Sequence, residues 1–442
     1  MAEKMASLIQ KSEINRTFEP KAKRSYMLNF IDLFAGAGGL SEGFIRAGFI
    51  PLAHIEMDRY ACDTLKTRAA FHWLKENNQL QKYKKYLYEK QEKEDGRKLW
   101  EQVPKSVIDT VIQSEIGEKT IAELFKKVDN LIGSNQVDII VGGPPCQAYS
   151  VVGRARDPQK MENDPRNFLY KYYIRFLKRY SPEMFVFENV PGILSAQNGE
   201  HFENIIKGIN KAGYVVKYEK LKASDYGVLQ NRERVIIIGW KKKLTMKYPD
   251  LKKEDNPYKI IPDLFSDLPA RQQGEGILTE AVQYIAPISE YLKKSHIRNG
   301  WDFTTQHIAR PHNPTDLEIY RRAINLWLKN KVRFNYATLP PELQNHNNKH
   351  SFLNRFQVVD PVCCHTVVAH IAMDGHYYIY PSLEQIRSIT IREAARLQSF
   401  PDDYYFEGSR SAAFKQIGNA VPVVLAHKIA EEIKVQFANG LQ

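Results

Sequence analysis

The sequence predicts an α/β fold, a largely parallel sheet with helices on its faces, from two kinds of segment. The stretch "MLNFIDLFAGAGGLSEGFIRAGF" (27–49) passes from an apolar strand through a glycine-rich turn into an amphipathic helix. This is the first βα unit of a nucleotide-binding sheet. "VDIIVGG" (137–143) and "MFVFENV" (184–190) are short apolar runs of the kind that forms buried strands.

The second βα unit, "PLAHIEMDRYACDTL" (51–65), is a strand followed by a helix with Asp58 at its expected N-cap. Glu56 ends that strand, where a carboxylate can accept hydrogen bonds from ribose hydroxyls. The glycine turn and the acid together indicate an adenosine cofactor, and a dinucleotide fits them equally well. A solvent-facing charge is the alternative for Glu56.

Composition bounds the remaining possibilities. The 442 residues can form two domains or one large, decorated domain, and Lys plus Arg exceed Asp plus Glu by twelve. Such an excess suits a partner with many phosphates, although solubility would explain it too. The four cysteines form no CxxC pair and no zinc-type spacing, so we expect reduced thiols, no disulfide and no metal. Since no apolar run has signal-peptide or membrane-span length, a cytoplasmic protein is expected.

A cysteine follows the third apolar run in "GGPPCQAYS" (142–150). Cys146 therefore lies past the carboxyl end of a strand, where open α/β sheets bind ligands, and the prolines restrict its backbone. A small apolar residue in a turn is the alternative. The next residues, 151–166, lack periodicity and carry Arg154, Arg156 and Arg166, which predicts a mobile lid or a disordered loop.

Two further strands carry charged residues. Glu188 ends the run 184–190, and a carboxylate there is costly to bury unless it is paired or protonated. "SDYGVLQNRERVIIIGW" (224–240) places Gln230, Arg232 and Arg234 at alternate positions, hence on one face of a strand. Arginines there suit a phosphate or a base edge, and an edge strand with a solvated basic face is the alternative.

Three other segments are predicted as helical. Residues 75–98 are rich in mixed charge and predict a solvated helix. "IDTVIQSEIGEKTIAELFKKV" (108–128) predicts strand, turn and helix. "NFLYKYYIRFLKRYSPE" (167–183) predicts a helix that ends at a proline, with aromatic residues four apart as core positions: Phe168, Tyr172, Phe176 and Tyr180.

The character of the chain changes after residue 240. Residues 241–365 are rich in proline, histidine and asparagine with poor periodicity, which predicts a second, inserted domain. "PVCCHTVVAHIAMDGHYYIYPS" (361–382) then predicts two strands around a turn at Asp374-Gly375. Thr390 and Glu393 form a capping-box pattern, and a closing helix follows the turn at 418–419.

Taken in order, six blocks resemble the signature blocks of the DNA cytosine-5 methyltransferases: "DLFAGAGG", "GGPPCQ", "FENV", "QNRERV", "ITIREAARLQSFPDDY" and "GNAVP". The match covers about 28–240 and 384–435. It implies a Rossmann-like S-adenosylmethionine-dependent methyltransferase sheet with a smaller, mostly irregular or β, inserted domain. The implied division is an N-terminal extension (1–27), a catalytic domain (28–240, with a charged insertion at 68–107), a target-recognition domain (241–383) and a returning C-terminal segment (384–442).

The resemblance assigns the catalytic residues. The thiolate of Cys146 would add to cytosine C6, because C5 is not nucleophilic enough unaided, and Glu188 would share a proton near N3. Arg234 would hold the O2 side of the base and Arg232 would support the same pocket. The Pro144 carbonyl would accept from the exocyclic amine. The product would be 5-methylcytosine.

S-adenosylmethionine is the implied methyl donor, with S-adenosylhomocysteine as its product and no metal. Glu56 would bind the ribose and Met57 would pack on the adenine. The family usually has an Asp-Ile pair after its third strand, and Glu115-Ile116 is the best candidate here. The whole implied cofactor set is Phe34, Gly36, Gly38, Gly39, Glu56, Met57, Glu115, Ile116, Pro144, Leu169, Asn419 and Val421.

The implied substrate is a cytosine flipped out of double-stranded DNA, with loop 148–166 closing over it. Val152 stands where some members carry a small polar residue that fills the vacated space. We further expect a monomer of the bacterial cytoplasm and nucleoid, paired with a restriction endonuclease. The implied DNA and base contacts are Gln147, Ser150, Arg166, Gln230 and Thr366.

The closest alternative is an RNA (tRNA) cytosine-5 methyltransferase of the same family, although the long inserted region favours a reader of DNA sequence. A nicotinamide dehydrogenase explains only the first βα unit. A regulator with a dead site would predict a damaged nucleophile block, and "PPCQ" is intact.

Overall fold

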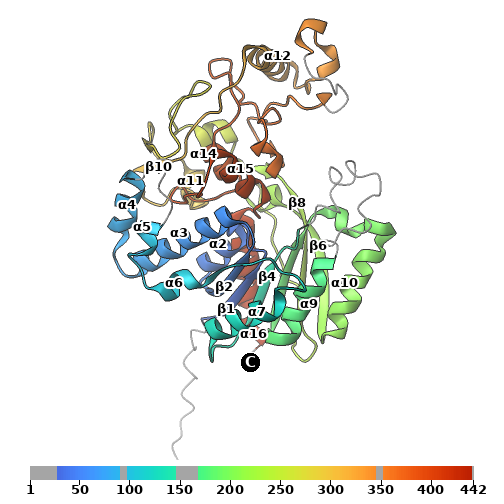
Figure 1. Cartoon of the computed structure of the whole chain (residues 1–442). Coiled ribbons are helices and arrows are strands. Elements are labelled where there is room, and N and C mark those ends of the chain that lie inside the picture. The colour runs from blue at the N-terminus through green and yellow to red at the C-terminus, as the bar shows by residue number, and fades with distance from the viewer. Residues whose placement is uncertain (1–26, 90–96, 146–167, 345–351, 441–442) are drawn as a thin grey trace, which may run out of the picture.

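The computed structural model describes residues 27–89, 97–145, 168–344 and 352–440. A twisted sheet with its helices forms the lower part of the molecule in Figure 1, and an irregular region lies above it. Among the described residues, no helix combines the length and the apolar character that crossing a membrane requires.

The sheet has seven strands in the order β3-β2-β1-β4-β5-β8-β6. The first five in the chain run parallel, and β8 runs antiparallel between β5 and β6. This confirms the predicted α/β class and its largely parallel sheet. The strands are β1 (Asn29–Leu33), β2 (Ile50–Glu56), β3 (Val111–Gln113), β4 (Ile139–Gly142), β5 (Met184–Asn189), β6 (Tyr214–Lys222) and β8 (Glu233–Lys241).

Helices cover both faces of the sheet because side chains alternate along each strand. Ile31 and Leu33 of β1 point into one core with α7 (Ile121–Ile132), α9 (Leu169–Tyr180) and α10 (Glu200–Lys211). Phe30 points into the other core, which α2 (Gly39–Arg46) and the closing helix α16 (Val423–Gly440) cover. The predicted helix after the glycine turn and the predicted closing helix are therefore confirmed.

Two predictions about burial are only partly confirmed. In α9 the predicted core position Phe176 is buried, and Tyr172 and Tyr180 pack against the same core, but Phe168 is 42% exposed. The fully buried Tyr173 and Leu177 lie beside the predicted stripe, because the face toward the sheet is rotated from it. The charged insertion (68–107) holds the end of α3 (Arg59–Glu76), all of α4 (Leu80–Glu89) and α5 (Arg97–Trp100), and the start of α6 (Lys105–Asp109). One face of α4 is not solvated, because Tyr83 and Leu87 share a core with Trp301 and Phe303.

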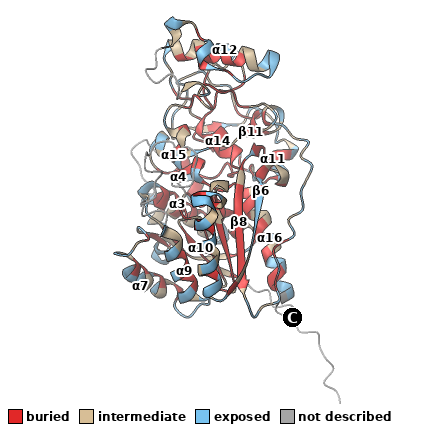
Figure 2. Ribbon diagram, turned by 90° about the vertical axis from the view of Figure 1, so that its right-hand side faces the viewer, coloured by how far each residue is buried: buried red, intermediate tan, exposed pale blue. Residues whose placement is uncertain are grey.

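Four short elements connect strands of the sheet: η2 (Pro191–Leu194), η3 (Ala196–Gly199), η4 (Ala223–Tyr226) and β7 (Gln230–Asn231). The irregular upper region follows β8 in the chain and consists of one long helix, α12 (Pro314–Asn330), and of shorter elements: η5 (Ile260–Phe265), β9 (Ala281–Gln283), α11 (Glu290–Lys294), β10 (Phe303–Thr305), η6 (Tyr336–Thr338), η7 (Pro341–Leu343), β11 (Cys364–His365), η8 (Ala369–Ala372), α14 (Ile391–Leu397) and α15 (Arg410–Asn419). Residues 260–297 share one core with 389–423. Figure 2 shows α12 farthest from the sheet, on a core of its own.

The predicted pair of strands in 361–382 is wrong. Only Cys364–His365 is a strand, and it pairs in parallel with β7, so its hydrogen bonds go to another segment and no hairpin forms. The predicted turn is present, since Gly375 has φ 79° and the Asp374 carboxylate accepts from the His376 N–H at 3.0 Å. The Thr390 capping box and the Asp58 N-cap are confirmed.

Candidate active site

The candidate site lies where the parallel strands end. Leu33 of β1 is opposite Gly142 of β4, which in turn is opposite Phe187 of β5. The antiparallel β8 enters at this same edge, since Val235 is opposite Asn189. The glycine turn, the loop after β4, the end of β5 and the start of β8 therefore meet at the carboxyl edge, where α/β sheets bind ligands.

The glycine turn after β1 has an unusual backbone. Phe34, Gly36 and Gly38 have φ of 59°, 54° and 80°, a region that side chains with a Cβ rarely adopt. A non-glycine residue held there at a ligand edge points to a functional constraint. A Cβ at Gly36 would have no atom within 4 Å, whereas one at Gly39 would lie 2.4 Å from the Val421 carbonyl oxygen. Gly36 thus borders open space, and Gly39 permits close packing on the C-terminal segment.

Glu56 closes this turn from the end of β2. Its Oε2 accepts from the Gly36 N–H at 2.8 Å, and its Oε1 accepts from the N–H groups of Met57 at 2.9 Å and Asp58 at 2.8 Å. Three backbone donors therefore fix the carboxylate beside the open side of the turn. The Met57 side chain is 61% exposed next to it, available to pack on a ligand.

Glu188 and Arg234 form an ion pair on neighbouring strands. The Arg234 Nε lies 2.6 Å from the Glu188 Oε1, and their side chains are 11% and 14% exposed. A Cβ at Gly143 would lie only 2.5 Å from the Glu188 Oε2, so this carboxylate packs directly on the loop three residues before Cys146. A single charge of such limited exposure would be costly without a partner. The ion pair therefore meets the requirement that Glu188 be paired or protonated.

Asn189, which sequence reasoning missed, contacts the same loop. It is 2% exposed, and its Nδ2 donates to the Pro144 carbonyl at 3.3 Å. Its Oδ1 accepts from the Val190 N–H at 2.9 Å, which fixes the amide. The sequence could have indicated Asn189, because an amide at the end of an apolar strand needs hydrogen-bond partners when it is buried.

Gln230 and Arg232 lie apart from the Glu188 pair, in the interior. Both are 0% exposed. Gln230 donates to the Leu397 carbonyl at 2.8 Å and accepts from the Val367 N–H at 2.9 Å. Arg232 donates to the carbonyls of Val367 at 2.5 Å and Gly418 at 3.2 Å. The alternative of a solvated basic face on an edge strand is therefore wrong. The prediction that Gln230, Arg232 and Arg234 share one face of a strand is also wrong, because Gln230 lies in β7 and Arg234 in β8, and these strands belong to different sheets.

The remaining predicted residues are spread around the edge. Thr366 is half-buried and donates to the Asn231 carbonyl at 2.7 Å. Asn419 is exposed at the end of α15, and Val421 is buried. The Ser114 N–H donates to the Glu56 carbonyl, which places the next residue, the exposed Glu115, near this edge.

Two apolar members of the predicted set are also described. Ile116 is 4% exposed and belongs to the core of the α7, α9 and α10 face. Leu169 is half-buried at the start of α9. The predictions for Cys146, Gln147, Ser150, Val152, Arg166 and the loop 148–166 lie outside the described residues.

Comparison with known proteins now decides the family. The family model for C-5 cytosine-specific DNA methylases matches residues 28–95 and 100–435. The chain belongs to this family. The predicted resemblance, fold class and DNA cytosine-5 methyltransferase activity are thereby confirmed.

Similar proteins agree with the assignment. The type II methyltransferase M.Bpa9945I of Bacillus paralicheniformis is 38% identical over 91% of this chain and 98% of its own. The type II methyltransferase M1.HphI of Haemophilus parahaemolyticus is 30% identical over 92% and 86%. The solved structure of the Entamoeba histolytica methyltransferase EhMeth shares the fold, with a TM-score of 0.53 at 14% identity over 93% and 99%.

For this DNA methylase, the carboxyl edge fits the adenosine donor that methyltransferases use. The turn from Phe34 to Gly39 leaves open space at Gly36, and Glu56 presents an oriented acceptor beside it. Beneath the turn, Asp32 is 1% exposed and accepts from the Ser41 hydroxyl at 2.5 Å. Burial raises the pKa of Asp32 to about 7, against this hydrogen bond, which lowers it. Asp32 was missed, although an acid within an apolar strand carries the same signal as Glu188.

Proposed function

We propose that this DNA methylase acts through a covalent adduct between Cys146 and cytosine C6, with Glu188 and Arg234 at the ring. The observation that carries the proposal is the Glu188–Arg234 pair at the carboxyl edge, packed on Gly143. The Cys146 assignment itself comes from the sequence block "GGPPCQ".

In the first step the Cys146 thiolate forms a bond to C6, and the C5–C6 electrons move toward C5 and the N3–O2 side of the ring. Glu188 holds a proton at N3, which stabilises the charge that the addition places on the base. Arg234 donates to O2 while it keeps its contact with Glu188. After C5 has gained a methyl group, its proton leaves, the Cys146–C6 bond breaks and 5-methylcytosine is released.

S-adenosylmethionine supplies the methyl group, as an electrophile on a sulfonium centre, and leaves as S-adenosylhomocysteine. Glu56 binds the ribose hydroxyls, and the exposed Met57 packs on the adenine. The turn is closed by Val421, whose carbonyl lies against Gly39, with Asn419 beside it. The rest of the proposed set is Phe34, Gly36, Gly38, Glu115, Ile116, Pro144 and Leu169.

We assign Gln230 and Arg232 as positioning residues. Their hydrogen bonds tie the segment just before β8, the strand that carries Arg234, to Val367 on one side and to Leu397 or Gly418 on the other. Full burial of Gln230 argues for this role over the predicted contact with DNA.

The DNA contacts follow the family pattern, with Gln147, Ser150, Arg166 and Thr366 next to the flipped base and residues 241–383 reading the sequence. Double-stranded DNA and a net charge of +12 are complementary. The type II relatives support a role in protecting DNA from a companion endonuclease. The methyltransferase is proposed to act as a monomer.

The test is bisulfite sequencing of plasmid DNA from a host without cytosine methylation, which expresses either the wild type or Cys146→Ser. Protected cytosines in one short sequence context, absent with the variant, are expected. Cys146→Ser with undiminished methylation would overturn the covalent route. No protected cytosine in DNA, with the protein folded and the donor bound, would make RNA the substrate.

A further inference from the structure

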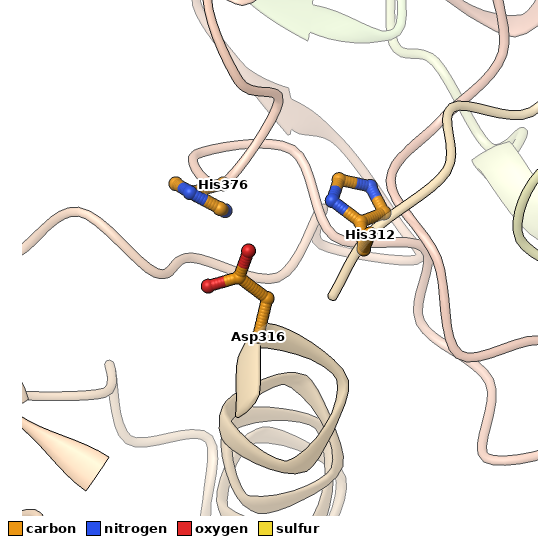
Figure 3. Close-up of side chains that lie close together, drawn as sticks. All are labelled: His312, Asp316 and His376. Atoms are coloured by element: carbon orange, nitrogen blue, oxygen red, sulfur yellow. The ribbon is translucent and has the colours of Figure 1, made fainter. Parts of the chain in front are cut away.

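Two histidines and an aspartate meet far from the methylation site, at the base of α12. His312 precedes the helix, Asp316 lies in its first turn and His376 follows the turn at Asp374-Gly375. One ligand atom from each lies within 4.8 Å of the other two. Figure 3 shows the Asp316 carboxylate directed toward the space between the imidazole rings. Asp316 and His376 are 9% and 6% exposed.

We propose that His312, Asp316 and His376 bind one divalent transition-metal ion, with zinc the expected occupant. The ion would join the start of α12 to the turn at 374–376. Two imidazoles and a carboxylate are a recurrent zinc donor set, and three protein ligands leave a fourth position for water. Zinc bonds of about 2.0–2.2 Å require these atoms to approach one another by roughly 1 Å, a shift within the reach of side-chain rotation.

The surroundings of the rings resemble those of metal-binding histidines, which hold their second nitrogen in a hydrogen bond. The His312 Nε2 lies 3.0 Å from the Ser388 hydroxyl, and the His376 Nδ1 lies 2.8 Å from the Tyr320 hydroxyl. The His312 Nδ1 has a longer contact of 3.4 Å with Tyr320.

Asp316 is held in place independently of any ion. The Asn313 side chain caps α12 by accepting from the Asp316 N–H at 2.8 Å, and its Nδ2 donates to the Asp316 Oδ2 at 2.8 Å. This reciprocal contact fixes the carboxylate on the first turn.

The donor set selects the class of ion. Magnesium and calcium prefer oxygen ligands, whereas zinc, cobalt and nickel gain from imidazole coordination. The nearby Arg355 pairs with Asp374 at 2.6 Å, so its charge is offset.

The experiment titrates the chelator-treated full chain with Co²⁺ and follows its visible absorption, with Zn²⁺ as competitor and Mg²⁺ as the oxygen-preferring ion. We expect one Co²⁺ per chain, displaced by Zn²⁺ and not by Mg²⁺, together with a higher Tm on binding. His376→Gln and Asp316→Asn should each weaken binding at least about 10-fold. The matched control is His296→Gln, which removes an exposed histidine outside the cluster.

The proposal is overturned if the wild type binds no more Co²⁺ than His376→Gln does, or if His296→Gln loses as much binding. If the ligand variants do not fold, Ser388→Ala keeps all three ligands and should weaken binding by about 10–100-fold through His312; unchanged binding would overturn the proposal. The readout is metal bound per chain, so failure here leaves the proposed methylation chemistry untouched.

Discussion

The sheet and the joint above it are held together by different interactions. We use "the joint" for the contact of residues 260–310 with 387–404. Apolar side chains fill the cores on both faces of the sheet. The joint also has an apolar core, but in addition it buries Arg387, Arg392 and Arg396, each at most 1% exposed. Arg396 donates to the Asp267 and Asp402 carboxylates at 2.6 Å each.

The difference teaches how each part serves the reaction. Apolar packing is non-directional, so it stabilises the sheet and tolerates changes of similar volume. A buried ion pair is directional, and it is costly to break because the remaining charge has no partner. The joint therefore fixes the irregular upper region relative to the carboxyl edge, and Arg232 extends this fixation to the edge through Val367 and Gly418.

The largest expected effect is catalytic, at the edge itself. Glu188→Gln keeps the shape of the side chain but removes its charge, so we expect kcat to fall by about 10²–10⁴-fold. The free energy of unfolding should fall as well, because Arg234 loses its charged partner. The control is Glu233→Gln. Glu233 directly precedes Arg234 and pairs with the exposed Lys220, so this variant should keep its rate. Single-turnover kinetics measures both, and equal rates for the two variants would remove Glu188 from the mechanism.

The second effect tests the joint against the sheet. Arg396→Met leaves Asp267 with Arg298 as its remaining charged partner and Asp402 with the Tyr284 hydroxyl. Both carboxylates lose their shared buried cation, and we expect a loss of about 3–5 kcal/mol in urea unfolding. Ile237→Val in the sheet core should cost only about 0.5–1.5 kcal/mol. Arg322→Met, at a surface ion pair, should change stability by less than about 1 kcal/mol. If Arg396→Met costs no more than Ile237→Val, the contrast between the regions fails.

The third effect concerns the one acid buried within the sheet. Because the pKa of Asp32 is about 7 in the folded protein and 3.8 as its ordinary value, the native state holds an extra proton between these values. Stability due to this group is present below 3.8 and lost as the pH rises to about 7. Asp32→Asn should therefore gain stability relative to the wild type across this window, by up to about 4 kcal/mol. A pH-independent difference in unfolding free energy would contradict this.

The smallest effect sharpens the description of the glycine turn. Glu56→Gln replaces a charged acceptor, so affinity for S-adenosylmethionine should fall by about 10–100-fold, or roughly 1.5–3 kcal/mol. The rate at saturating donor should change little. Glu115→Gln, at an exposed position, should change affinity less. Calorimetric titration separates the two, and a larger loss with Glu115→Gln would reverse the assignment.

Local pattern predicted the sheet part well because its signals are short-range. The strand, glycine turn and helix at 27–49 and the Asp58 and Thr390 caps are confirmed. The prediction for the segment 361–382 was wrong because its strand pairs with β7, which lies more than 130 positions earlier in the chain. The burial of α4 was missed for the same reason, since its partner Trp301 lies over 200 residues away.

The sequence by itself determined the fold class, the order of the family blocks and which strand ends carry acids, because alternation, glycine turns and costly buried charges are visible in a few adjacent residues. Only the tertiary structure decided what those groups contact. It placed Glu188 on Gly143 and Arg234 and turned Gln230 and Arg232 inward. It also brought His376 to His312 and Asp316. The physical reason is that contacts between distant segments depend on how whole elements pack, which no local period records.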